Sequence, residues 1–232
     1  LGYGRAANAG VESSTGEWVV IANPDIVWQP GSIDELLAAG RRWPRAGSLG
    51  PLIRTGAGEV YPSARALPSL RHGIGHALLG WWWPGNPWTA AYRAERDAPR
   101  EREAGWLSGS CLLLRRRAFE QVSGFDPSYF MYFEDVDLGQ RLGLRGWQNV
   151  YVPSAQVIHT GGHATSRHKS RMAAEHHRSA WQYLSRQYAG WRWLPVRAVI
   201  KVGLVARELL SRRVSGVSSA AALRRPSEGN EQ

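Results

Sequence analysis

Three carboxylates follow an aromatic, almost wholly apolar run in the middle of the chain. The run covers residues 129–133, and the carboxylates are Glu134, Asp135 and Asp137. An apolar pattern of near-helical spacing continues to Gly146, so we expect Glu134 and Asp135 in the first turn of a helix. Acids in a first turn could simply offset the helix dipole. A carboxylate at the edge of an apolar pocket is poorly solvated, however, and its pKa can be tuned to that of a general base.

A second group of polar side chains ends the apolar run at residues 18–22, which we expect to be a strand buried on both faces. The group is Asn23, Pro24 and Asp25. An ordinary turn after a strand would explain these residue types. A carboxylate just beyond the carboxyl end of a parallel strand is also where α/β folds bind ligands. A divalent cation that bridges two phosphates needs only one or two such oxygens from the protein.

Two further segments place polar groups beside predicted strands. His159 ends a short strand expected at residues 156–159. A lone histidine there is more often structural, but its position one strand after the acids makes it a candidate metal ligand. Glycines and small hydroxyls at residues 105–110 precede another apolar run, where a ligand could approach the backbone closely.

The order of the elements predicts the fold class. A helix with a capping-box pattern at Ser32 and Glu35 follows the first strand, and the next strand is expected at residues 48–53. Strand, helix and strand in this order predict an α/β fold with a mostly parallel sheet flanked by helices. Residues 54–105 have an irregular pattern, with a tryptophan-rich segment at residues 81–88 that we interpret as a flap.

The composition is that of a globular protein with one substantial core. The chain has 232 residues, including 12 tryptophans, 26 glycines and a single cysteine. One cysteine excludes an internal disulfide framework and is consistent with a reducing compartment. Cys111 lies in an apolar run, which favours an inert core thiol.

The formal net charge of +10 calls for a polyanionic partner. Nucleic acid is disfavoured, because the basic residues form no known nucleic-acid module and the acidic motifs would repel phosphate. The basic residues are concentrated late in the chain, and the helix expected after Pro195 is preceded by Trp191 and Trp193. Such a cationic amphipathic helix suits an anionic membrane surface, although a helix packed on the domain with a solvated basic face is the alternative.

The pattern divides the chain into three parts. Residues 1–165 form the predicted catalytic core, residues 166–213 a basic, membrane-proximal helical segment, and residues 214–232 a disordered tail. No uninterrupted apolar run reaches the roughly 20 residues that span a bilayer.

Six motifs occur in a recognisable order, and they are residues 1–10, 23–25, 105–110, 124–126, 134–138 and 157–162. Their order resembles that of the family 2 inverting glycosyltransferases, which have the GT-A fold. Within this family the chain is most similar to the actinobacterial rhamnosyltransferases of cell-wall linker synthesis. The resemblance implies transfer of L-rhamnose from dTDP-rhamnose to N-acetylglucosaminyl-diphosphoryl-polyprenol by a peripheral enzyme on the cytoplasmic face of the cell membrane.

The resemblance also implies a role for each motif residue. Asp135 matches the catalytic base, while Asp25 and His159 match ligands of a divalent cation, Mg²⁺ or Mn²⁺, on the donor diphosphate. The residues implied on the acceptor side are Glu134, Trp106, Ser108 and Gly109. Those implied on the donor side are Arg5, Asn8 and Asn23, the last standing where the family usually has an acid.

One departure from the family concerns the start of the chain. The family begins with nucleotide-binding strands that would precede Leu1. We therefore expect an exposed sheet edge, an incomplete nucleoside pocket and weak or no activity for the 232-residue form alone. An inactive remnant and a nucleotidyltransferase of similar fold remain the alternatives.

Overall fold

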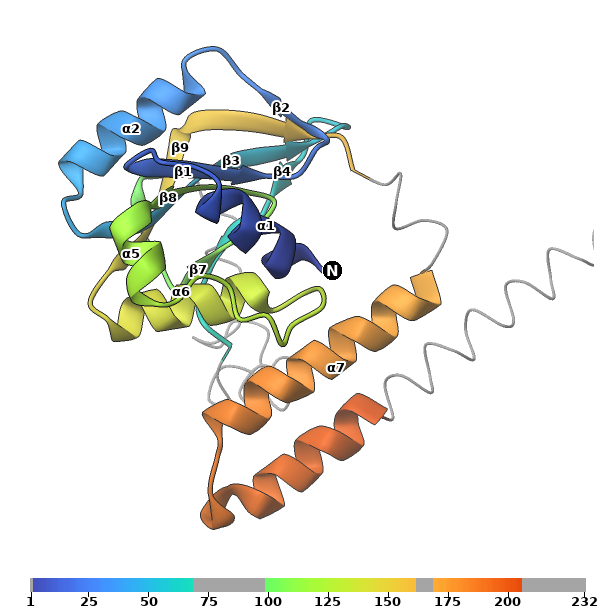
Figure 1. Cartoon of the computed structure of the whole chain (residues 1–232). Helices are drawn as coiled ribbons and strands as arrows, with labels where there is room; N and C mark the ends of the chain where they lie inside the picture. The colour runs from blue at the N-terminus through green and yellow to red at the C-terminus, as the bar shows by residue number, and fades with distance from the viewer. Residues whose placement is uncertain (1, 69–98, 162–168, 206–232) are drawn as a thin grey trace, which may run out of the picture. The chain divides into compact units, whose positions relative to one another are not determined.

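The computed structural model describes residues 2–68, 99–161 and 169–205 (Figure 1). The chain forms two compact units, residues 1–162 and 163–232, which are described separately below. The predicted tryptophan-rich flap and C-terminal tail lie outside the described residues.

The first unit is built around a mixed sheet with the strand order β1-β8-β3-β9-β2, with β4 beside β3 and β6 beside β9. The strands are β1 (Trp18–Ala22), β2 (Ile26–Trp28), β3 (Ala46–Thr55), β4 (Val60–Tyr61), β6 (Arg102–Ala104), β8 (Cys111–Arg115) and β9 (Gln148–His159). A separate two-stranded sheet pairs β5 (Ala64–Arg65) with β7 (Trp106–Leu107).

The expectation of a mostly parallel sheet is wrong. Of the described pairings, that of β3 with β9 is parallel and the others are antiparallel. β1 and β3 do run in the same direction, as strand, helix and strand predict. They are not neighbours, because β8 lies between them and is antiparallel to both.

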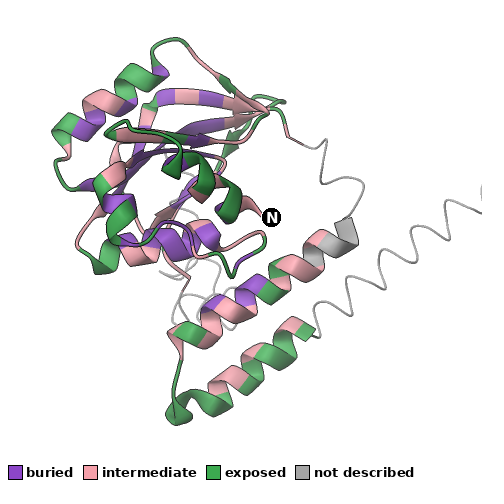
Figure 2. Cartoon of the chain, viewed as in Figure 1, coloured by how far each residue is buried: buried purple, intermediate pink, exposed green. Residues whose placement is uncertain are grey.

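Helices cover both faces of the sheet, which confirms the α/β class. The helices of this unit are α1 (Tyr3–Glu12), α2 (Ser32–Arg42), α5 (Arg116–Gln121) and α6 (Glu134–Leu144). Successive side chains of a strand point to opposite faces. Leu112 and Leu114 of β8 accordingly share a core with α1, α5 and α6, while Leu113 shares a second core with Leu36 and Ala39 of α2. The buried residues lie in the strands and on the helix sides that face them (Figure 2).

β1 forms one edge of the sheet. It pairs with β8 on one side, and no described strand pairs with its other side. Val20 is 42% exposed, so the expectation of a strand buried on both faces is wrong. The exposed sheet edge expected from the sequence is present among the described residues.

α2 begins without the predicted capping box. Gly31 occupies the cap position in the left-handed conformation, with φ 77°, and no side chain caps the helix. Ser32 instead bonds to β9, because its Oγ donates to the Gln156 carbonyl (2.7 Å) and accepts from the Gln156 N–H (3.0 Å). The short strand expected at residues 156–159 is thus the end of the longer strand β9, whose pairing with β3 is irregular just before Gln156.

The second unit contains α7 (Lys169–Gln187), the short helix η2 (Trp191–Trp193) and a helix over residues 194–205. Arg197 and Lys201 lie over the ring of Trp181 in α7, at 6.0 and 5.6 Å from its centroid. These two cations of the predicted basic face therefore pack against α7. No helix in the described part of the chain is long and apolar enough to cross a membrane.

Candidate active site

A turn of unusual backbone conformation delivers the two acids to the first turn of α6. Tyr132 and Phe133 both have positive φ, 67° and 66°, which is strained for bulky side chains. Backbone strain of this kind persists where the surrounding structure imposes it and is frequent at active sites. Glu134 and Asp135 follow directly, in the helical position that the sequence predicts.

Two backbone N–H groups fix the carboxylate of Asp135. Oδ2 accepts from Gly109 (2.9 Å) and Oδ1 accepts from Val136 (2.8 Å). Burial raises the pKa of Asp135, and these N–H groups and the more distant charge of Arg65 oppose that shift. Each carboxylate oxygen keeps a lone pair for another donor, so the group can accept a proton from a substrate hydroxyl.

Glu134 is 7% exposed. Burial, and secondarily the charge of Asp135, raises its pKa from 4.5 to about 7. Its Oε2 is buried and has no hydrogen-bond partner among the described residues. A glutamate in this state can donate a hydrogen bond near neutral pH as well as accept one.

Tyr3 lies against the acids and was not identified from the sequence. Its hydroxyl donates to the Gly109 carbonyl, and its backbone N–H donates to the Phe130 carbonyl (3.1 Å). Burial, followed by the charges of Glu134 and Asp135, raises its pKa. Tyr3 therefore ties together the two loops that position the base. A tyrosine next to a glycine in the opening motif gave no sign of this role.

The segment 106–110 joins the acids to the turn after β1. Gly109 bonds to Asp135 as described, and the carbonyl of the next residue, Ser110, accepts from the Asn23 N–H (2.9 Å). At the other end of the segment the ring of Trp106 lies 5.7 Å from the Arg65 guanidinium carbon. Residues that are far apart in the sequence therefore converge on one short stretch of backbone.

Asp25 and His159 are brought together by strand pairing. Ile26, the first residue of β2, is the register partner of His159, the last residue of β9. His159 Nε2 lies 3.1 Å from Asp25 Oδ1 and 3.3 Å from Asn23 Nδ2. The Asp25 and His159 side chains are 34% and 25% exposed, so a ligand can reach them.

This pair fits a divalent cation that takes part of its coordination from a substrate. A carboxylate oxygen and an imidazole nitrogen are suitable ligands for such an ion. Among the described residues, no three His, Cys, Asp or Glu side chains come close enough to form a complete site. The remaining ligands would have to be oxygens of the substrate or of water.

The predicted donor-side residues of α1 contact the loop that leads to α6. Arg5 is exposed, and its Nε donates to the Pro127 carbonyl (3.0 Å). The Asn8 amide donates to the Phe125 carbonyl (2.8 Å) and accepts from the Phe125 N–H (2.9 Å). These bonds fasten α1 to the loop and use the Asn8 carbonyl oxygen and one of its two N–H groups. Binding of the donor by either residue stays a prediction.

The predicted acceptor-side residues differ in their access to the base. Trp106 donates from Nε1 to the Ala66 carbonyl (3.1 Å), and Gly139 leaves room for it, since a Cβ there would lie 2.7 Å from the Trp106 Cβ. Ser108 is buried, and its Oγ lies 3.1 Å from that of Ser110. Gly109 contacts the base directly, whereas Ser108 supports the loop. Contact of these residues with the acceptor also stays a prediction.

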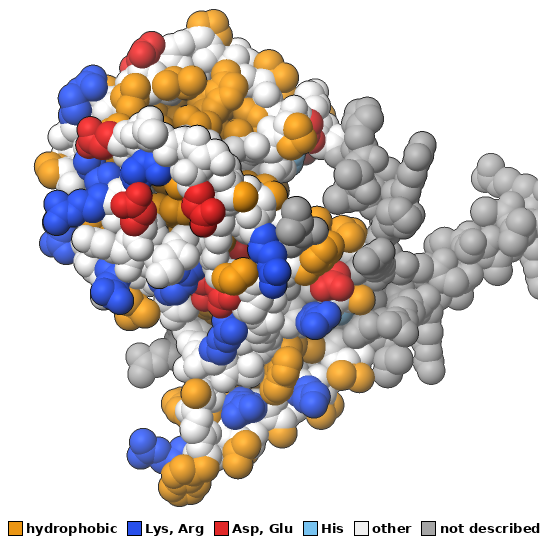
Figure 3. Space-filling view, viewed as in Figure 1, with side chains coloured by type: hydrophobic (Ala, Val, Ile, Leu, Met, Phe, Trp, Pro, Cys, Tyr) orange, Lys and Arg blue, Asp and Glu red, His pale blue; other side chains and the backbone are white. Residues whose placement is uncertain are grey.

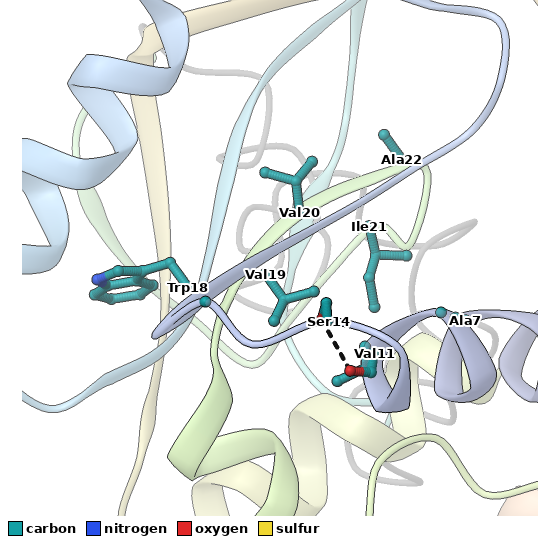
Figure 4. Close-up of a pocket in the computed structure, with 10 residues that line it drawn as sticks. Ala7, Val11, Ser14, Trp18, Val19, Val20, Ile21 and Ala22 are labelled. Carbon is teal, nitrogen blue, oxygen red and sulfur yellow. Dashed lines mark hydrogen bonds between the residues drawn. The ribbon is translucent and has the colours of Figure 1, made fainter.

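A groove of about 420 Å³ runs between α1 and the free edge of β1 (Figure 4). Val19 and Ile21 point toward α1, where Ser14 Oγ donates to the Val11 carbonyl (2.8 Å). The lining is mostly apolar and ends at Ala22, next to Asn23. The groove contains none of the acids, and it extends from the Asn23 turn along the sheet edge.

The chain is similar in sequence to known proteins. Residues 2–188 match the family described as glycosyltransferase-like family 2. The chain is 54% identical over 226 residues to the N-acetylglucosaminyl-diphospho-decaprenol L-rhamnosyltransferase of Mycobacterium tuberculosis (strain ATCC 25618 / H37Rv), covering 93% of this chain and 74% of that protein. It is 42% identical over 82 residues to the rhamnosyltransferase WbbL of Escherichia coli (strain K12), covering 35% of this chain and 31% of that protein.

Two solved structures also resemble the chain. The mannosyltransferase PcManGT from Pyrobaculum calidifontis, in complex with GDP-Man and Mn²⁺, is 14% identical with a TM-score of 0.49, covering 97% of this chain and 56% of that one. GalNAc-T7 with UDP, GalNAc and Mn²⁺ is 14% identical with a TM-score of 0.49, covering 69% of this chain and 30% of that one. This chain therefore spans less than two thirds of either solved chain. The family match and the 54% identical relative show that the chain belongs to glycosyltransferase-like family 2.

Proposed function

We propose that the protein transfers L-rhamnose from dTDP-rhamnose to an N-acetylglucosaminyl-diphosphoryl-polyprenol acceptor in cell-wall polysaccharide synthesis. The 54% identical relative, which carries the name of this reaction, supports the sugar and the acceptor. The observation that carries the reaction type is the backbone link from Asp135 through Gly109 and Ser110 to the Asn23 turn. A base and a donor-binding turn are thereby held at neighbouring points of one loop.

In the proposed mechanism Asp135 is the general base of a single inverting displacement. Its carboxylate takes the proton of an acceptor hydroxyl as that oxygen attacks the anomeric carbon of the donor. The bond between the anomeric carbon and the donor diphosphate breaks in the same step. The fixed N–H bonds from Gly109 and Val136 hold the carboxylate in one orientation during the attack.

Asp25 and His159 are the residues that would hold a divalent cation, Mg²⁺ or Mn²⁺, with Asn23 beside them. When bound, this ion would neutralise the charge of the departing diphosphate. On the donor side we assign Arg5, Asn8 and Asn23.

On the acceptor side we assign Glu134, Trp106, Ser108 and Gly109. Glu134 can exchange hydrogen bonds with a sugar hydroxyl because its Oε2 has no described partner. The Trp106 ring offers an apolar face suited to stacking on a pyranose.

A further proposed partner is the anionic, cytoplasmic surface of the cell membrane, where a polyprenyl-linked acceptor would be located. Hydrophobic and basic side chains lie together on the helices of the second unit (Figure 3). A set of apolar side chains is exposed there, namely Trp191, Trp193, Leu194, Val199, Val202 and Val205. Exposed apolar and basic groups together suit an interfacial helix.

Asp135→Asn tests the reaction, assayed with the product of the complete reading frame, dTDP-rhamnose and a short-chain diphosphoryl acceptor. We expect turnover to fall by about 10²–10⁴-fold, the usual contribution of a positioned base, with nearly unchanged donor affinity. Asp34→Asn, on the exposed side of α2, removes the same charge as a matched control and should retain full activity.

Two results would contradict this assignment. Loss of donor affinity in Asp135→Asn would make Asp135 a donor or cation ligand rather than the base. If the wild-type protein transferred a sugar from another nucleotide sugar but not from dTDP-rhamnose, the proposed donor would be wrong.

A further inference from the structure

The proposed acceptor carries a diphosphate at the anomeric carbon of its sugar, and a protein that binds it needs a cation on the acceptor side of the base. Arg65 is a candidate for this role. It ends β5, the strand that pairs with β7, and its register partner is Trp106. Its charge reaches Asp135, whose pKa it lowers against the larger opposite effect of burial.

The guanidinium of Arg65 is held in place by its neighbours. Its carbon lies 5.7 Å from the centroid of the Trp106 ring and 5.8 Å from that of Tyr61, and Nε donates to the Pro62 carbonyl (2.9 Å). The two terminal nitrogens have no hydrogen-bond partner among the described residues. A guanidinium fixed at Nε with both terminal nitrogens available has the fork geometry that binds a phosphate by two hydrogen bonds.

The segment 106–110 sets the order of the groups around the reaction. Arg65 contacts it at Trp106, Asp135 at Gly109 and Asn23 at Ser110. Along this backbone the base therefore lies between Arg65 and the donor-binding turn. From Trp106 to Gly109 the backbone can span at most about 10 Å, so the two contact points of Arg65 and Asp135 on this segment are close to each other.

We propose that Arg65 binds the diphosphate of the acceptor, on the opposite side of Asp135 from Asp25 and His159. The acceptor would then lie with its sugar hydroxyl at Asp135 and its anomeric phosphate at Arg65. Two diphosphates, one of the donor and one of the acceptor, would occupy separate cationic positions on either side of the base. This inference rests on the proposed function for the identity of the acceptor.

Arg65→Gln tests it with two acceptors that differ only in charge near the sugar. One is N-acetylglucosaminyl-diphosphoryl-geraniol, and the other is an uncharged alkyl N-acetylglucosaminide. We expect the KM for the diphosphoryl acceptor to rise about 10-fold or more, while the KM for the neutral glycoside and for dTDP-rhamnose stays unchanged. Arg65→Lys should recover part of the loss. Arg41→Gln, an exposed arginine near the end of α2, is the charge-matched control and should change neither KM.

An equal loss with both acceptors would overturn the proposal, because Arg65 would then act through the base or the fold. Unchanged kinetics with both acceptors would overturn it as well. Calorimetric binding of the diphosphoryl acceptor, without donor, separates this inference from the proposed function. Weaker binding by Arg65→Gln supports the diphosphate site even if the transferred sugar is another one, and equal binding by both proteins refutes it.

Discussion

At the scale of single residues, Tyr3 helps to orient the base through an intermediate residue, Gly109. It does not contact the Asp135 carboxylate in any described hydrogen bond, but its hydroxyl holds the Gly109 carbonyl and Gly109 holds Asp135. Tyr3 is therefore a positioning residue, and its substitution should affect turnover more than binding.

We expect Tyr3→Phe to lower kcat by about 3–10-fold, which corresponds to the loss of one hydrogen bond in a preorganised site. The KM for the donor should stay unchanged, because α1 and the loop at Phe130 keep their backbone bond. Steady-state kinetics with both substrates will measure this split. Tyr151→Phe, which removes the hydroxyl of a buried tyrosine in β9, is the control and should leave kcat unaltered. A loss of thermal stability that accounts for the whole fall in activity would contradict the positioning role.

The acids, the Asn23 turn and His159 could be identified from the sequence, because in each place polar or ionisable residues stand at the end of an apolar run. The structure places Asp25 beside His159 and Asp135 near the Asn23 turn, although their catalytic roles remain predictions. Tyr3 and Arg65 could not be found in this way. Their importance comes from contacts with residues more than forty positions away, which no local pattern records.

At the scale of elements, the buried Glu134 at the start of α6 destabilises the folded protein when its carboxylate is ionised. The folded state raises the pKa of Glu134 from 4.5 to about 7, so the folded protein binds its proton more tightly than the unfolded chain. Stability contributed by this group must therefore fall as the pH rises from about 4.5 to about 7.

Glu134→Gln removes the ionisable carboxyl group and with it this destabilising effect. We expect the variant to be more stable than the wild type at pH 8, by on the order of 2–3 kcal/mol, with a smaller difference at pH 5. Urea unfolding at the two pH values measures this. Glu120→Gln, on the exposed side of α5, should show no such pH dependence. A wild-type protein that gains stability relative to Glu134→Gln as the pH rises would mean that the pKa shift has the opposite sign.

Helices α2 and α6 and the longer strands β1, β3, β8 and β9 could be predicted from periodicity, whereas the short strands β2, β4, β5, β6 and β7 were not predicted. Two further features could not be predicted. The position of β8 between β1 and β3 depends on pairing between distant segments, which a local sequence pattern does not reveal. The predicted capping box does not form, because Ser32 Oγ makes two hydrogen bonds with the backbone of Gln156, which lies more than a hundred residues later in β9.

At the scale of the whole molecule, the second unit exposes several large apolar side chains among its described residues. Val199 and Val202 are 73% and 69% exposed on the helix over residues 194–205. Since Arg197 and Lys201 lie on Trp181, the outer face of this helix is more apolar than the sequence suggested. We therefore expect its membrane affinity to depend on inserted side chains as well as on charge.

The double substitution Val199→Ser and Val202→Ser should weaken binding to vesicles that contain phosphatidylglycerol by about tenfold or more, because each valine would bury apolar surface in the interface. Co-sedimentation at low and high salt measures the effect. Val27→Ser, at a position of the first unit that is 50% exposed, is the control. Binding that responds to salt alone would show that insertion of these side chains is not required.

The closeness of Asp25 and His159 has one further consequence. Main-chain bonds between β2 and β9, rather than the side chains themselves, keep the two positions adjacent. Shortening either side chain should leave a vacancy of defined size in an otherwise unchanged scaffold. A small molecule of matching chemistry, imidazole in place of the histidine or formate in place of the aspartate, could enter that vacancy and restore what the missing group supplied.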